Sequence, residues 1–134
     1  MKNHRITPEQ ITQLEENQIF VFGSNEAGIH GAGAARAALA FGAEMYKGFG
    51  LAANTFAIPT KDWEIAVLPL PVIKMYVERF LAFAKLSPDF QFLVTPIGCG
   101  LAGYKPVDIA PLFIGALEIE NVHLPESFWH YVTL

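Results

Sequence analysis

The sequence predicts an α/β fold, a three-layer α/β/α sandwich with a mostly parallel central sheet. Short apolar runs that are typical of buried strands alternate with longer segments of helical period. Glycine clusters follow directly after two of the apolar runs, where α/β sheets place their ligand sites. The 134 residues contain no internal repeat, low-complexity tract or linker, so we expect one domain over residues 1–134.

The elements of the first half follow from capping signals, apolar runs and alanine content. Residues 8–16 follow Thr7, a favourable N-cap, and begin with proline, which predicts a short helix. The run IFVF at 19–22 ends at a glycine and predicts a buried strand. Residues 31–47 are rich in alanine and predict a helix whose small side chains pack closely on a sheet. The run TFAIP at 55–59 predicts a second strand.

The second half continues the alternation. Apolar side chains recur at helical spacing over residues 71–86, which predicts an amphipathic helix. The run FQFLVTPI at 90–97 predicts a third strand, and residues 108–118 predict a further helix after a proline. Two short segments are candidates for terminal strands, at 121–124 and 129–133.

Composition and charge exclude several classes of protein. Nine basic and thirteen acidic residues give a net charge of −4, and the basic residues are scattered, so we expect no extended nucleic-acid surface. No stretch resembles a membrane span or the apolar core of a signal peptide. Cys99 is the only cysteine, so no internal disulfide forms. The sequence therefore predicts a cytoplasmic protein that does not associate with membranes.

Two glycine-rich segments follow predicted strands, GSNEAGIHGAGAARAAL at 23–39 and IGCGLAGY at 97–104. Glycine lets backbone amides approach an anion closely, and each segment leads into a predicted helix. We therefore expect a diphosphate to lie between the 28–35 loop and the 98–104 loop. The alternative is that these glycines only form tight turns and close contacts between helix and sheet.

Two familiar phosphate-binding motifs do not match. A Rossmann fingerprint requires a third glycine three residues after the second, where this chain has Arg36, and an acidic residue about 20 residues further on, which residues 50–59 lack. A Walker A loop is absent because no glycine is followed by lysine and then serine or threonine.

The two segments together resemble the macro domains, which bind ADP-ribose and sometimes hydrolyse its linkages. Asn25 after a strand, followed by Gly31-Ala32-Gly33, is similar to one loop of that family, and IGCGLAGY with Tyr104 is similar to the loop around the phosphates and distal ribose. The resemblance covers most of residues 19–118. It implies that this chain binds ADP-ribose or a derivative, free or attached to protein or nucleic acid. The ligand-binding residues it implies are Asn25, Gly28, His30, Gly31, Ala32, Gly33, Ala34, Gly98, Cys99, Gly100, Leu101, Ala102, Gly103 and Tyr104.

A narrower resemblance is to the branch that contains terminal ADP-ribose protein glycohydrolase. Ile58-Pro59-Thr60-Lys61 and Ile97-Gly98-Cys99-Gly100-Leu101 match its two motifs, so the branch's lysine corresponds to Lys61. Its aspartate after the second motif corresponds to Ala102, which removes the carboxylate used in turnover. The chain also resembles bacterial and phage macro-domain-like proteins that share its SN-x-x-G-x-H-G-x-G-A-A and IPTKD patterns.

Several side chains have alternative roles. Asn25 has the donor and acceptor needed for a pair of ribose hydroxyls, or it shapes the loop. His30 is a candidate for proton transfer or a structural histidine. Lys61 is a candidate catalytic residue, together with Asn25; it pairs with phosphate, attacks the ribose, or forms a surface salt bridge with Asp62 or Glu64.

Other side chains are assigned more simply. Cys99 is expected to be a small buried loop residue, and Asp108 is expected in the first turn of its helix. Phe49 and Tyr104 are candidates to flank a base or ribose. The four histidines are isolated and no metal-ligand motif occurs, so neither a metal nor a cofactor is expected. No residue in 1–24 is identified as the reader of adenine.

Three functions follow from these observations. The first is binding of ADP-ribose through the two loops. The second is a hydrolase that removes ADP-ribose from a macromolecule or dephosphorylates ADP-ribose 1''-phosphate, against which Ala102 weighs. The third is an interaction module with a vestigial pocket.

Overall fold

A computed structural model describes residues 5–132 and contains one five-stranded sheet with the order β2-β3-β1-β4-β5. β1 lies in the middle and pairs in parallel with both β3 and β4, β4 pairs in parallel with β5, and β2 is antiparallel to β3. The sheet is therefore mostly parallel, as predicted. The strands are β1 (Gln18–Asn25), β2 (Gly50–Ala52), β3 (Thr55–Lys61), β4 (Gln91–Val94) and β5 (Val122–His123).

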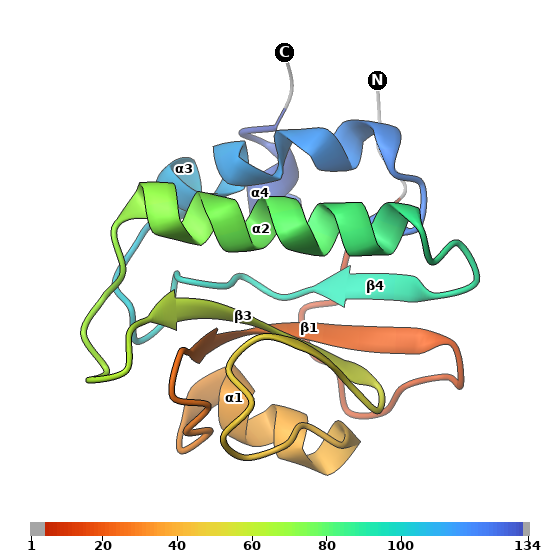
Figure 1. The fold of residues 1–134 in the computed structure, drawn as a ribbon. Coiled ribbons are helices and arrows are strands. Elements are labelled where there is room, and N and C mark those ends of the chain that lie inside the picture. The colour runs from red at the N-terminus through yellow and green to blue at the C-terminus, as the bar shows by residue number, and fades with distance from the viewer. Residues whose placement is uncertain (1–4, 133–134) are drawn as a thin grey trace.

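Helices cover the sheet from two sides. Figure 1 shows α1 on one face, and α2, α3 and α4 on the other. The helical segments are α1 (Gly33–Ala38), η1 (Leu39–Phe41), α2 (Leu70–Lys85), α3 (Pro106–Ile109), η2 (Ala110–Glu118) and α4 (Glu126–Trp129), where η marks a 3-10 helix. None of the helices in residues 5–132 has the length and apolarity that a membrane crossing requires.

Strand β1 is buried because both of its faces meet helices. Ile19 and Val21 belong to the large core under α2 and η2, whereas Phe20 and Phe22 pack with Ala35 of α1 on the other face. This alternation is the period of two that a strand imposes on its side chains. The small side chains of α1 allow it to lie close to the sheet, as the alanine content predicts.

The amphipathic helix predicted at 71–86 is α2. Ile73, Val77 and Phe80 are fully buried at helical spacing, and the ring of Phe80 lies 5.0 Å from that of Phe56 and 5.4 Å from that of Phe92. Aromatic contacts of this kind fill the larger core. The helix predicted at 108–118 is also present, but most of it is the 3-10 helix η2.

Three sequence predictions are wrong in the structure. Residues 8–16 form no helix: the backbone N–H of Thr7 donates to Leu124 O at 2.9 Å, which ties this segment to the chain after β5. The helix predicted at 31–47 ends by residue 41, because Gly42 takes a left-handed conformation with φ of 103°. Residues 129–132 are the end of α4 and a turn rather than a strand, and residue 133 lies outside the described residues.

Candidate functional site

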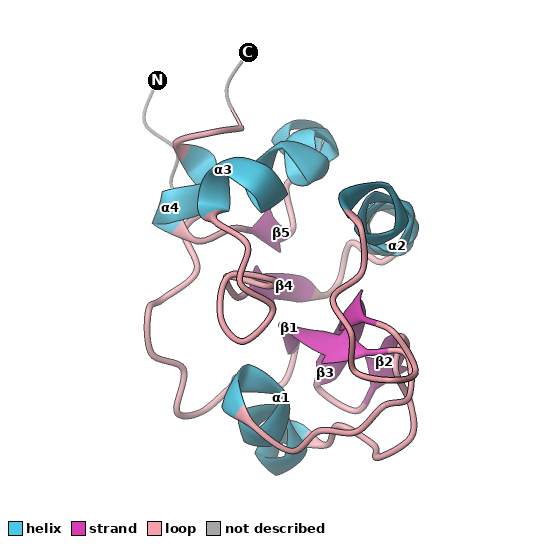
Figure 2. Cartoon of the chain, turned by 90° about the vertical axis from the view of Figure 1, so that its left-hand side faces the viewer, coloured by secondary structure: helices cyan, strands magenta, loops and turns pink. Residues whose placement is uncertain are grey.

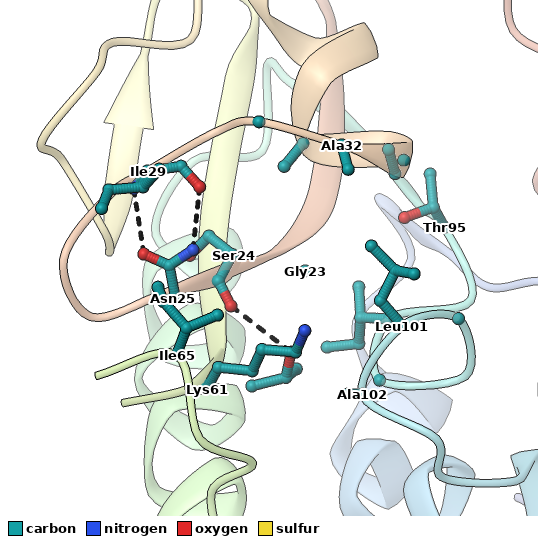
Figure 3. Close-up of a pocket in the computed structure, with 18 of the residues that line it drawn as sticks. Gly23, Ser24, Asn25, Ile29, Ala32, Lys61, Ile65, Thr95, Leu101 and Ala102 are labelled. Atoms are coloured by element: carbon teal, nitrogen blue, oxygen red, sulfur yellow. Dashed lines mark hydrogen bonds between the residues drawn. The ribbon is translucent and has the colours of Figure 1, made fainter. Parts of the chain in front are cut away.

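A cavity of about 470 Å³ lies where the two glycine loops meet (Figure 3). We call it the glycine cavity. Figure 2 shows the ribbon at this end of the sheet, with α1 below the strands and α3 above them. Asn25 at the end of β1, Lys61 at the end of β3 and Thr95 after β4 all line it, because parallel neighbouring strands end at the same edge of the sheet. The volume lies within the range of small-molecule sites.

The structure brings both loops to this cavity. A Cβ added at Gly33 would lie 4.0 Å from Leu101 Cδ1, so the loops are nearly in contact. The residues of the implied site that line the cavity are Asn25, Gly31, Ala32, Gly33, Ala34, Gly98, Gly100, Leu101 and Ala102, and Lys61 joins them. The implied residues outside its lining are Gly28, His30, Cys99, Gly103 and Tyr104.

Backbone amides are the polar groups that both loops offer. Among the described residues, the N–H groups of Ala32, Gly100, Leu101 and Ala102 donate to no other protein atom, although all four residues line the cavity. Ala32, Gly100 and Leu101 are exposed and Ala102 is half-buried, so their amides are open to water or to a ligand. Unpaired amides of residues that line one cavity suit an anion.

Lys61 adds a positive charge. Its side chain extends into the space between the loops (Figure 3). Among the residues described, it is the only charged one in the cavity lining. Asp62 is used elsewhere, since its Oδ1 accepts hydrogen bonds from the N–H groups of Glu64 at 2.8 Å and Ala66 at 3.0 Å. A charged amine and unpaired amides in a lining that has no carboxylate among the described residues favour an anionic ligand.

Asn25 shapes the loop that follows it. Its side chain is 7% exposed; Nδ2 donates to Ile29 O at 2.8 Å, and Oδ1 accepts from Ile29 N at 2.9 Å (Figure 3). The amide therefore closes residues 25–29 into a compact turn. One N–H and one lone pair of the amide remain for another partner.

Three of the implied residues have structural contacts instead. His30 is buried, its Nε2 lies 2.8 Å from Glu44 O, and its ring meets Phe22 edge-on. The Tyr104 hydroxyl donates to Leu68 O at 2.6 Å. Burial, with a smaller contribution from Asp108, raises the pKa of the Cys99 thiol to about 11, so the thiol is protonated near neutral pH.

Asp108 lies in the first turn of α3, as expected. One of its carboxylate oxygens accepts a hydrogen bond from the backbone N–H of Lys105 at 3.0 Å, and the backbone N–H of Asp108 donates to Lys105 O at 2.8 Å. The carboxylate thus stabilises the beginning of this short helix.

The glycines of the two loops divide into two kinds. Gly28 and Gly98 have φ of 69° and 74°, and an added Cβ would lie 2.3 Å from Lys47 N and 2.9 Å from Ile109 Cδ1 respectively. The fold itself therefore requires glycine at both positions. At Gly31 and Gly100 φ is not left-handed and an added Cβ would meet nothing within 4 Å. These two glycines border open space in the cavity.

Sequence reasoning missed several residues of the cavity wall. Thr95 donates its hydroxyl hydrogen to Val21 O at 2.8 Å and presents its oxygen lone pairs as acceptors. It also lines a second cavity of about 1000 Å³, which shares Ala34, Thr95 and Pro96 with the first. Thr95 comes directly after β4, which ends at Val94, whereas the strand predicted at 90–97 includes it, so the prediction gave no sign that a polar side chain follows the strand end here.

Comparisons of the chain with family profiles, curated proteins and solved structures gave no match. Over residues 5–132, no three His, Cys, Asp or Glu side chains gather closely enough to hold a metal ion.

Proposed function

We propose that this protein binds ADP-ribose or a close derivative, with the diphosphate in the glycine cavity between the two loops. One observation carries the proposal: free backbone amides from both loops and the Lys61 ammonium group line a single cavity that no carboxylate lines among the described residues. A diphosphate matches that arrangement in charge and in acceptor number. The macro-domain resemblance of the same loops supports the choice, and with it a three-layer, macro-domain-like fold.

The neighbouring cavity supports a ligand of this length. It adjoins the glycine cavity at Thr95 and Pro96, and its walls include the apolar side chains of Ile6, Ile11 and Phe20. An apolar wall beside an anion site suits a nucleoside joined to a phosphate. The adenosine half of the ligand would therefore lie toward Phe20, and the distal ribose toward Asn25 and Lys61.

Binding is a better-supported proposal than hydrolysis. Lys61 extends into the cavity, as a hydrolase that uses this lysine requires, but Ala102 stands where the related branch has an aspartate. Activation of water or of a leaving group needs a general acid or base within hydrogen-bonding reach. A vestigial pocket is the least supported proposal, because the space between the loops is open.

Calorimetric titration with ADP-ribose tests the proposal. We expect binding by the wild-type chain and a loss of at least about tenfold in affinity for Gly31→Val and Gly100→Val, because both positions line the cavity and accept a side chain without forcing a left-handed φ. Ala82→Val, on the exposed side of α2, adds a similar volume away from the cavity and should leave the affinity unchanged. No heat and no thermal shift at about 1 mM ligand would end the proposal, since even that Kd corresponds to roughly −4 kcal/mol.

A further inference from the structure

One wall of the second cavity belongs to a segment without regular structure. Residues 8–14 form neither helix nor strand, and Pro8, Glu9 and Ile11 of this segment line the cavity. We call residues 8–14 the strap. The remaining lining includes residues of β1, α1 and α4. Figure 2 shows this part of the chain as the long loop on the left, which runs from α4 to α1.

The strap is anchored at both ends. Before it, the backbone N–H of Thr7 donates to Leu124 O at 2.9 Å. After it, the backbone N–H of Gln18 donates to Glu15 O at 3.0 Å, and the backbone N–H of Glu15 donates to Gln18 Oε1 at 2.9 Å. Both ends are therefore tied to the sheet region by hydrogen bonds.

The strap itself is held only by two apolar side chains. Its backbone groups make no hydrogen bond to any residue that the structure describes. Ile11 and Leu14 are half-buried and pack against the smaller core, which includes Phe20 and Ala35, whereas the other five side chains of the strap are exposed. A segment with few apolar contacts and no backbone hydrogen bonds opens at a lower free energy than the whole fold. We therefore expect the strap to open locally.

A buried hydroxyl at the first anchor points to a ligand in the second cavity. Thr7 lines this cavity and is 5% exposed, and its Oγ1 has no hydrogen-bond partner in the described part of the chain. A buried hydroxyl without a partner is uncommon and unfavourable. A ligand in the second cavity would offer Thr7 a partner and cover Ile11. It would thus favour the closed position of the strap over the open one.

We propose that the strap is the lid of the second cavity. It opens when Ile11 and Leu14 leave the smaller core, admits the ligand, and closes over it. Because the anchors at Thr7 and Glu15 stay in place, only the segment between them moves. The proposal rests on the proposed function, in which the adenosine half of ADP-ribose lies in this cavity, and it makes reopening of the strap a condition for ligand release.

A spin label on the strap tests whether the ligand closes it. Gln13 is exposed and lines neither of the two cavities, so Gln13→Cys in a Cys99→Ser background carries the label without entering the site. We expect the electron paramagnetic resonance spectrum to contain a mobile component that saturating ADP-ribose removes. The control is the same label at Lys85→Cys, at the end of α2, whose spectrum should not change.

Leu14→Ser tests whether the strap controls ligand exchange. Leu14 packs on the smaller core but lines neither of the two cavities, so its replacement acts on the ligand only through the strap. Stopped-flow binding of ADP-ribose should show dissociation about tenfold faster and association about threefold faster, which weakens the affinity about threefold. Damage to the cavity itself would slow association instead. Gln13→Ser, an exposed position of the same strap, is the control and should leave both rates unchanged.

The failures of the two proposals are distinguishable. If ADP-ribose gives no heat in calorimetry, the proposed function is refuted, and the lid with it. If ADP-ribose binds but the label at residue 13 is immobile beforehand, or keeps the same mobility in the complex, the lid alone is refuted. The lid is also refuted if Leu14→Ser leaves the dissociation rate unchanged or slows association.

Discussion

Replacement of Asn25 by alanine tests whether its amide holds the loop at the end of β1. The substitution removes two hydrogen bonds, from Nδ2 to Ile29 O and from Ile29 N to Oδ1. Each hydrogen bond contributes about 1 kcal/mol net to the free energy of unfolding. Truncation of this buried side chain also leaves some unfilled volume. Because Ile29 is partly exposed, its freed peptide groups regain water and add little further cost. We expect the free energy of unfolding to fall by about 2 to 3 kcal/mol.

That loss converts into a thermal shift through the size of the chain. An unfolding entropy of about 2.1 cal/mol/K per residue over 134 residues corresponds to about 0.28 kcal/mol/K. The melting temperature of Asn25→Ala should therefore fall by about 7 to 11 °C, as measured by circular dichroism without ligand.

Asn17→Ala is the matched control. The side chain of Asn17 is exposed. Its backbone carbonyl accepts a hydrogen bond from Gln91 N at 2.9 Å, and the substitution leaves that bond in place. Its melting temperature should stay within about 2 °C of the wild type. If Asn25→Ala melts together with Asn17→Ala, the amide does not hold the loop, and its role would have to lie in ligand contact alone.

The other predictions concern Lys61, Gly98 and Cys99. Lys61→Gln should weaken ADP-ribose binding about 5- to 30-fold at low salt and less at high salt. Lys85→Gln, at the surface, is the control, and an equal loss of affinity in this variant would contradict a local charge effect. Gly98→Ala should lower the melting temperature by about 4 to 7 °C, because φ at this position is 74° and the new Cβ would lie 2.9 Å from Ile109 Cδ1. Gly100→Ala is the control, and its melting temperature should stay within about 2 °C of the wild type. With its pKa raised to about 11, Cys99 should react slowly with iodoacetamide at neutral pH, and its alkylation rate should still rise between pH 9 and 11; a plateau below pH 9 would show that burial does not hold the thiol protonated.

Strands β1, β3 and β4 and the long helix were predictable because their patterns arise from burial alone, whereas no strand was predicted at β2. The run at 19–22 is apolar throughout since both faces of β1 meet helices, and the helical spacing within 71–86 reflects one face of α2 in the core. The meeting of the two loops also follows from the sequence. Once two parallel strands are neighbours, the segments after their carboxyl ends share an edge of the sheet.

The failures occurred where tertiary contacts outweigh local signals. Thr7 has the chemistry of an N-cap, but its backbone pairs with Leu124, and the segment after it forms no helix. WHYVT at 129–133 is rich in β-formers, yet Phe128 and Trp129 are buried from α4, which begins after Pro125. Distant contacts also decide which side chains of the glycine loops line the cavity. His30 and Tyr104 lie outside its lining, and each is held by a hydrogen bond to a distant backbone oxygen, of Glu44 and of Leu68 respectively.

The glycines of the two loops are neither all ligand-site residues nor all residues of tight turns. Gly28 and Gly98 are required by the fold, since any side chain there would strain the backbone and overlap a neighbour. At Gly31 and Gly100 there is neither backbone strain nor overlap, since φ is not left-handed and an added Cβ would meet no atom within 4 Å, and both residues line the cavity. The open glycines, rather than the strained ones, are therefore the positions at which substitution separates a binding site from a tight turn.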